Sequence, residues 1–176
     1  MPKWYVVPQK TCFAELETLV SNSKAVIVSG YFSPIHTGHL DMIEAAAELG
    51  DEVIVIVNNN AQQVMKKGKV IIDEADRLRI VQALSLVDHA LIAVDEDRTV
   101  SASLEKIADD FSDRTLVFAN GGDRKPEFVP EAAVCEAHNI ELRFGVGGDN
   151  KADSSSRINV ELGLEDEMSA PPSETT

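Results

Sequence analysis

The chain has 176 residues, of which 44% are hydrophobic and 26% are charged, a composition typical of a soluble globular domain with a single core. Its net charge of −14 argues against a general surface for nucleic acid or for an anionic membrane, although basic residues can still gather locally around a nucleotide. No apolar run approaches the roughly 20 residues of a membrane span, so we expect no membrane partner. The first residues lack a signal-peptide pattern, and Cys12 and Cys135 lie far apart in the sequence. We therefore expect a cytoplasmic protein with reduced thiols.

Helices and strands are predicted to alternate along the chain. Residues 1–24 form an N-terminal extension with a helix over 11–20, which can cover a sheet edge or a partner. Apolar strands are predicted at 25–29, 52–57, 89–94, 115–119 and 140–144. Helices are predicted from about Thr37 to Gly50 and at 73–87, 99–111, 130–138 and 154–162. Residues 163–176 form an acidic, flexible tail after a body of residues 25–162.

Two helices show a clear apolar face. The helix ending at Gly50 has a predicted buried stripe of Leu40, Ile43, Ala47 and Leu49. The helix over 73–87 carries Leu78, Ile80, Val81 and Leu84.

The strands are continuous apolar runs rather than alternating ones. This pattern predicts a parallel sheet covered by helices on both faces, so the fold class is α/β, with one doubly wound, Rossmann-like domain built on a five-stranded sheet. Ligands in such folds bind beyond the carboxyl ends of the strands. The loops that follow the strands are therefore the places to look for a site.

The stretch from Val26 to Leu40 reads as a buried strand, a turn and the opening of a helix. His36 and His39 lie three residues apart, so both can face the same anion if the helix begins near Thr37. Gly38 allows a ligand to approach the backbone. Alternatively, such a pair is an incidental surface feature or half of a metal site, although no cysteine or carboxylate lies nearby at zinc-ligand spacing.

Residues 30–39, Gly-Tyr-Phe-Ser-Pro-Ile-His-Thr-Gly-His, resemble the Gly-x-Phe-x-x-x-His-x-Gly-His signature of the cytidylyltransferase-like nucleotidyltransferase superfamily. The resemblance extends over about residues 25–160. It implies that His36 and His39 are catalytic, and that nucleotide is bound by Gly30, Tyr31, Phe32, Ser33 and Gly38. Ser33 departs from the Asp found in many members.

Residues 58–69 are predicted to form a flexible polar loop with three cations, Lys66, Lys67 and Lys69. Taken alone, such a loop is usually just solvated. The resemblance implies that these lysines contact the phosphates of both substrates, Lys66 and Lys69 in catalysis and Lys67 in nucleotide binding. It also favours Arg77 over Arg79 as a catalytic residue, although either can be an exposed helix arginine.

Two further loops follow later strands. Residues 120–127 are similar to the Gly-Gly-Asp-Tyr-Lys-Pro-Glu stretch of heptose-1-phosphate adenylyltransferases, with Arg124 in place of Tyr. Residues 154–156 resemble the hydroxyl-rich start of the superfamily's last helix. Predicted nucleotide-binding residues in these loops are Asn120, Gly121, Gly122, Asp123, Arg124, Ser154, Ser155 and Ser156. A tight turn and a serine linker are the alternatives without function.

The resemblance implies transfer of a nucleotidyl group from an NTP to a small phosphorylated acceptor, with release of pyrophosphate. ATP is favoured over CTP, and a sugar 1-phosphate as acceptor, because residues 120–127 fit the adenylyltransferases. Mg²⁺ is expected as the cofactor, held mainly by the NTP phosphates. The alternatives are a CTP-dependent enzyme acting on an alcohol phosphate or phosphonate, a non-catalytic nucleotide-binding module, and an interaction protein. The sequence is compatible with a homo-oligomer and does not decide the oligomeric state.

Overall fold

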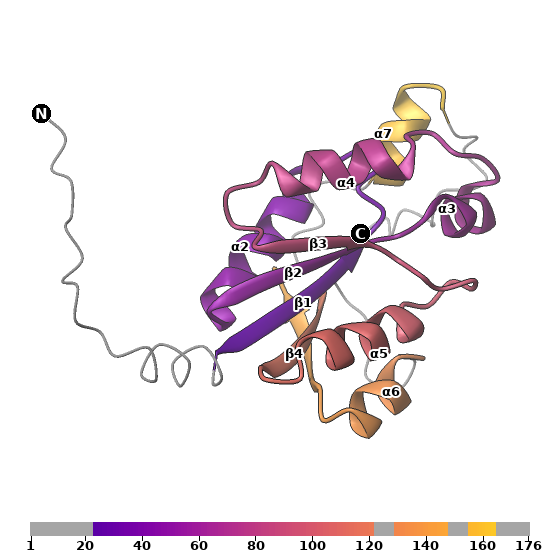
Figure 1. Ribbon diagram of the computed structural model, residues 1–176. Helices are drawn as coiled ribbons and strands as arrows, with labels where there is room; N and C mark the ends of the chain where they lie inside the picture. The colour runs from indigo at the N-terminus through magenta and orange to yellow at the C-terminus, as the bar shows by residue number, and fades with distance from the viewer. Residues whose placement is uncertain (1–22, 122–128, 148–154, 165–176) are drawn as a thin grey trace, which may run out of the picture.

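The computed structural model of the chain describes residues 23–121, 129–147 and 155–164. One sheet of five parallel strands forms its centre, in the order β3-β2-β1-β4-β5 (Figure 1). The strands are β1 (Lys24–Gly30), β2 (Glu52–Val57), β3 (His89–Ile92), β4 (Thr115–Gly121) and β5 (Glu141–Val146). Because the chain winds outward from β1 in both directions, the predicted doubly wound α/β fold is confirmed.

Helices cover both faces of the sheet (Figure 1). On one face lie α2 (Thr37–Leu49) and α4 (Glu74–Gln82), and on the other lie α5 (Ser101–Asp110) and α6 (Ala132–Ala137). Two more helices, α3 (Asn60–Lys67) and α7 (Ser155–Glu161), stand at the end of the sheet toward which the β1 arrow points (Figure 1).

The central strands are apolar throughout because both of their faces are buried. In β1, Val26 and Val28 pack with α2 and α4, whereas Ala25 and Ile27 pack with α5 and α6. All four side chains are fully buried. Since successive side chains of a strand point to opposite faces, only a continuous apolar run can supply both layers.

Three predictions about the helices were wrong in detail. Residues 60–67 of the predicted polar loop are helical, as described below. The helix predicted over 73–87 ends at Gln82, because the backbone then continues in tight turns in which Leu84 N–H bonds to Val81 O and Val87 N–H to Leu84 O. In α2, Leu40 is exposed, and Met42 and Ala46 join Ile43 in the core. The predicted set with Leu40 and the observed set with Met42 and Ala46 both fit a period of 3.6 residues, so periodicity alone could not choose between the two faces of the helix.

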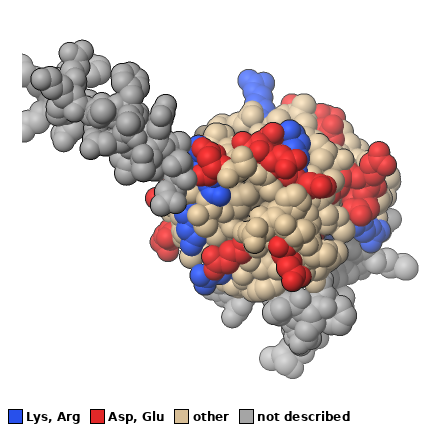
Figure 2. All heavy atoms as spheres, turned by 60° about the horizontal axis from the view of Figure 1, so that its bottom comes forward, with Lys and Arg blue, Asp and Glu red and all other residues tan. Residues whose placement is uncertain are grey.

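The predicted helix over 11–20 and nearly all of the predicted tail over 163–176 lie outside the described residues. Within the described part of the chain, no helix is long and apolar enough to cross a membrane. Figure 2 shows the face that carries α5 and α6, where acidic side chains are spread among basic ones and no large basic patch forms.

Candidate active site

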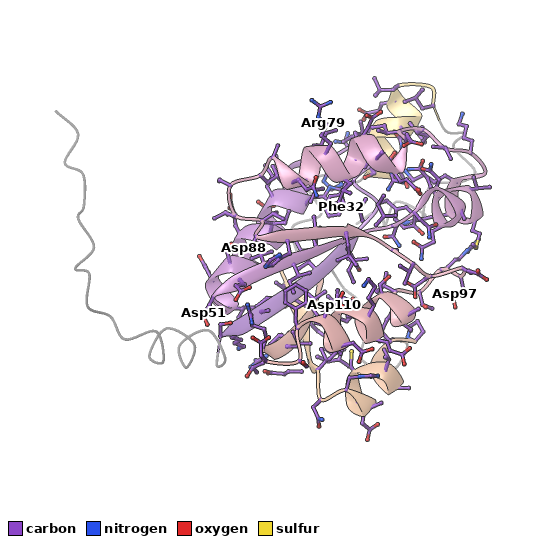
Figure 3. All side chains as sticks on the ribbon, in the orientation of Figure 1. Phe32, Asp51, Arg79, Asp88, Asp97 and Asp110 are labelled. Carbon is purple, nitrogen blue, oxygen red and sulfur yellow. The ribbon has the colours of Figure 1, made fainter. Side chains whose placement is uncertain are left out.

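The turn after β1 is built around Phe32. The side chain of Phe32 is buried under α4 (Figure 3), although its backbone has a φ of 49°. A Cβ atom on Gly30 would meet the Phe32 ring at 3.1 Å, so glycine at position 30 leaves room for that ring. The ring in turn packs against His39, with 4.6 Å between the ring centroids. The signature residues thus form one packed unit.

His36 and His39 are brought together at the start of α2. Their ring centroids are 3.9 Å apart, and His36 is the residue that immediately precedes the helix. The His36 backbone N–H donates to Nδ1 of His39 at 3.3 Å. In the neutral ring the proton of His39 therefore sits on Nε2, which makes Nε2–H a hydrogen-bond donor. Gly38, the second residue of the helix, lies between the two histidines.

His39 is held neutral by its surroundings. Burial, first, and then the nearby His36, Lys66 and Lys67 together lower its pKa from 6.5 to about 3. A neutral imidazole with a fixed tautomer can donate to an anion without first having to lose or gain a proton.

Helix α3 brings two lysines to the same turn. Nζ of Lys66 lies 4.4 Å from the centroid of the Tyr31 ring, a cation–π contact. Nζ of Lys67 donates to the carbonyl oxygen of Ser33 at 3.3 Å. Lys69 lies beyond Gly68, whose φ of 76° ends the helix, and its side chain is exposed. The structure therefore places Lys66 and Lys67 against the signature turn, but not Lys69.

The helical form of α3 depends on contacts that sequence analysis missed. Asn59 Oδ1 accepts from Gln62 N–H at 2.8 Å, and Gln62 Oε1 accepts from Asn59 N–H at 3.0 Å, which is a reciprocal capping box. The Asn59 amide also donates to the carbonyls of Ala93 and Asp95. The Asn-x-x-Gln spacing directly after a strand was the available signal.

Arg77 is completely buried in α4. Its Nη1 donates to the carbonyls of Tyr31 and Asn58, and its Nε donates to the carbonyl of Ile72 at 2.9 Å. Its Nη2 donates to Asn60 Oδ1 at 3.2 Å. The guanidinium thus joins the ends of β1 and β2, and the geometry fits a positioning role better than the predicted direct contact with substrate.

Helix α7 is hydrogen-bonded to the signature turn from the far end of the chain. Ser155 Oγ donates to the Pro34 carbonyl at 3.0 Å, and the buried Asn159 amide donates to the Ser33 carbonyl at 3.0 Å. Ser156, the next residue of the helix, is half-buried. Sequence analysis missed Asn159. Its only signal was the spacing of four residues from Ser155, which places both on one face of a helix.

Two buried polar atoms near this turn have no hydrogen-bond partner among the described residues, Ser33 Oγ and Asn120 Nδ2. Asn120 lies near the carboxyl end of β4, and the following residue, Gly121, packs against Met42 of α2. Since buried polar groups are usually paired, these atoms are suited to meet a ligand. The remaining predicted residues, Gly122, Asp123, Arg124 and Ser154, lie outside the described part of the chain.

The arrangement is suited to binding a phosphorylated anion. Two imidazoles, two ammonium groups and a serine hydroxyl surround one turn at the carboxyl end of β1, where backbone N–H groups also begin a helix. Within residues 23–121, 129–147 and 155–164, no group of three or more His, Cys, Asp or Glu side chains could hold a metal ion.

Comparison with known proteins agrees with this geometry. The family model described as cytidylyltransferase-like matches residues 27–162. The FAD synthase of Methanosphaerula palustris is 35% identical over 136 residues, which is 77% of this chain and 84% of that protein. The FAD synthase of Ferroglobus placidus is 40% identical over 87 residues, 49% of this chain and 55% of that protein.

Two other similarities are more partial. The bifunctional protein HldE of Histophilus somni is 36% identical over 108 residues, 60% of this chain but 21% of that longer protein. The crystal structure of the lipopolysaccharide core biosynthesis protein from Thermoplasma volcanium superposes with a TM-score of 0.53 at 24% identity, covering 70% of this chain and 94% of that one. This last similarity supports the fold alone.

Proposed function

Because the chain belongs to the cytidylyltransferase-like family and is an enzyme of the nucleotidyltransferase type, we propose that it transfers a nucleotidyl group, adenylyl before cytidylyl, from an NTP to a small phosphorylated acceptor. Pyrophosphate is the second product. The observation that carries the proposal is the convergence of His36, His39, Lys66 and Lys67 on one turn.

The proposed reaction needs no covalent intermediate. A phosphate oxygen of the acceptor attacks the α-phosphorus in line, an O–P bond forms, and the bond between the α-phosphorus and the bridging oxygen to the β-phosphate breaks. The electron pair leaves with pyrophosphate, so negative charge grows on the leaving group. The work of the protein is to align the reactants and to stabilise this charge.

The described side chains divide this work. His36 and the neutral His39 donate hydrogen bonds to the α- and β-phosphate oxygens, and Lys66 and Lys67 offset the charge of the transferring and leaving phosphates. The Ser156 hydroxyl would donate to the leaving phosphates, and the Ser155 hydroxyl would do so on leaving the Pro34 carbonyl. Direct participation of Lys69 stays a prediction from the sequence.

A Mg²⁺ ion fits this site only if the nucleotide brings it. The residues around the turn are imidazoles, ammonium groups and hydroxyls, which are poor ligands for a hard cation that prefers carboxylate, phosphate and water oxygens. When bound, Mg²⁺ would screen the charge of the phosphates. The protein would hold the complex through His36, Lys66 and Lys67 rather than through the ion.

ATP is the proposed donor because FAD, the product named for two of the relatives, contains adenine. Two phosphomonoesters are acceptors to test first. FMN follows from the FAD synthases, since FAD is FMN joined to AMP through a diphosphate. A sugar 1-phosphate follows from the similarity of residues 120–127 to heptose-1-phosphate adenylyltransferases. CTP with glycerol 3-phosphate is the alternative pair.

The test is pyrophosphate release with ATP or CTP, Mg²⁺, and each of FMN, a heptose 1-phosphate and glycerol 3-phosphate. We expect one pair to turn over, and His36→Ala to lower the rate by about 10²–10³ because it removes a donor to the growing charge. His138→Ala is the matched control, since His138 follows α6 on the other face of the sheet.

Thermal unfolding with each nucleotide separates the alternatives. A nucleotide at about 100 times its dissociation constant should add roughly 2.7 kcal/mol to the free energy of unfolding. Stabilisation without pyrophosphate release from any pair would favour a binding module. No stabilisation by either nucleotide, together with no turnover, would contradict the proposal.

A further inference from the structure

The carbonyl oxygen of Ser33 accepts hydrogen bonds from two donors that lie far apart in the sequence. Lys67 Nζ reaches it from the last turn of α3 at 3.3 Å, and Asn159 Nδ2 reaches it from α7 at 3.0 Å. Ser33 and Asn159 are both fully buried. The carbonyl therefore depends on donors from the protein for its hydrogen bonds.

The two donors differ in what they can do next. Lys67 is a half-buried cation on a long, flexible side chain, whereas Asn159 has a short amide enclosed within the fold. An ammonium group makes a stronger, charge-assisted bond to phosphate than to a neutral carbonyl. Once a nucleotide phosphate reaches the turn, Lys67 binds the phosphate more strongly than the Ser33 carbonyl. The Asn159 amide, enclosed within the fold, stays with the carbonyl.

We propose that Asn159 is a positioning residue, which keeps the Ser33 carbonyl hydrogen-bonded while Lys67 moves from that carbonyl to a phosphate of the bound nucleotide. The inference rests on the proposed function, since the exchange requires a bound nucleotide. Without the amide, a nucleotide that draws Lys67 away leaves the buried Ser33 carbonyl without a hydrogen bond, and this weakens nucleotide binding.

Loss of the Asn159 amide should affect the free and the nucleotide-bound protein differently, which a purely structural role would not predict. In the nucleotide-free protein Lys67 still pairs with the carbonyl, so loss of the Asn159 amide should cost little global stability. In the bound protein the same loss leaves the carbonyl without either donor. The effect should therefore appear mainly in nucleotide affinity.

The first experiment compares Asn159→Ala with the wild-type protein by calorimetric titration with ATP and with CTP, each with Mg²⁺. We expect the dissociation constant of the bound nucleotide to rise roughly ten-fold, the usual effect of leaving one buried polar group unpaired. Glu161→Gln is the matched control on the same helix, because the exposed carboxylate of Glu161 pairs with Arg157 and lies outside the proposed exchange at Ser33. It should bind nucleotide as the wild type does.

The second experiment repeats the substitution in a Lys67→Met background. There the Ser33 carbonyl depends on Asn159 in the free and the bound protein alike. Asn159→Ala should now lower the unfolding temperature of the nucleotide-free protein and no longer change the dissociation constant. An equal loss of affinity in both backgrounds, or no loss in the wild-type background, would overturn the inference.

Failure of the inference and failure of the proposed function give different results. Wild-type protein that binds neither ATP nor CTP contradicts the proposed function. Wild-type protein that binds one of them as tightly as Asn159→Ala does contradicts only the role of Asn159. If Asn159→Ala does not fold, Asn159→Ser keeps a small polar group in the buried position and allows the same comparison.

Discussion

At the scale of single residues, the fold imposes the protonation state of His39. His39 would be partly charged near neutral pH if it were exposed, but burial and the neighbouring cations shift its pKa to about 3. The His36 backbone N–H also fixes which nitrogen keeps the proton. His39 can therefore act as a neutral donor at any physiological pH, and a bound anion does not have to wait for its protonation.

The lowered pKa of His39 makes stability depend on pH in a defined window. Between pH 6.5 and about 3 the unfolded chain binds a proton at His39 that the folded chain does not, so stability is complete above pH 6.5 and falls as pH decreases. The loss should approach, at most, about 1.4 kcal/mol per pH unit. Urea unfolding at pH 7, 6 and 5 should show a shallower decline for His39→Gln than for wild type. Identical slopes of unfolding free energy against pH for His39→Gln and wild type would contradict the lowered pKa of His39. His138→Gln is the control and should show the wild-type slope.

At the scale of elements, Arg77 connects segments that secondary structure alone leaves separate. From α4 it donates to the backbone at the ends of β1 and β2 and to the side chain of Asn60 in α3. A planar guanidinium presents donors from three nitrogens at fixed, separate positions, whereas the three donors of an ammonium group all start from one nitrogen. Together with the contacts of Lys66 and Lys67, this side chain holds the signature turn beside α3.

Replacing Arg77 by lysine should therefore be severe. Arg77→Lys keeps the positive charge, but one ammonium nitrogen cannot replace Nε, Nη1 and Nη2 at their separate positions, so we expect a loss of roughly 2–4 kcal/mol in the free energy of unfolding. Arg79→Lys is the control two residues along the same helix, where the side chain projects away from the molecule (Figure 3). It should change stability by less than about 0.5 kcal/mol. Denaturant unfolding of both variants makes the comparison, and equal stabilities would refute the bracing role.

At the scale of the whole molecule, the start of α2 packs against the backbone at the carboxyl ends of β4 and β5. Gly121 at the end of β4 and Gly147 after β5 both lie against Met42 of this helix. A Cβ atom on Gly147 would come within 2.9 Å of the Met42 Cα atom, and the φ of Gly147 is 91°. The close approach holds the edge of the sheet to the helix that begins at the signature.

Substitutions at the two glycines Gly145 and Gly147 can distinguish the cost of backbone strain from the cost of the close contact with Met42. Gly145 has a φ of 69°, but a Cβ atom there would meet nothing within 4 Å. Gly145→Ala should cost about 1–2 kcal/mol through its left-handed backbone alone. Gly147→Ala should cost a further 1–3 kcal/mol because the helix backbone must move. Thermal unfolding of both variants tests this order, and equal costs would show that α2 yields freely.

Much of the fold was determined by local pattern in the sequence. Apolar runs such as Val53–Val57 can be strands buried on both faces, and each was followed by a helical period, so the parallel α/β sheet could be predicted. The signature turn could also be predicted, because Gly30, His36 and His39 form a recognisable pattern within ten residues. These features depend on near neighbours in the chain, which a sequence displays directly.

Other features were decided only by tertiary structure. Residues 60–67 are polar enough to be a loop, and although the spacing of Asn59 and Gln62 was a local helix signal, only the fold shows that the buried Gln62 amide donates to the carbonyls of Asp97 and Thr99. The choice of Lys66 and Lys67 over Lys69 follows from that helix. Asn159 meets Ser33 across 126 residues of chain. No local pattern encodes such contacts, because they depend on where the folded sheet brings distant carbonyls and donors together.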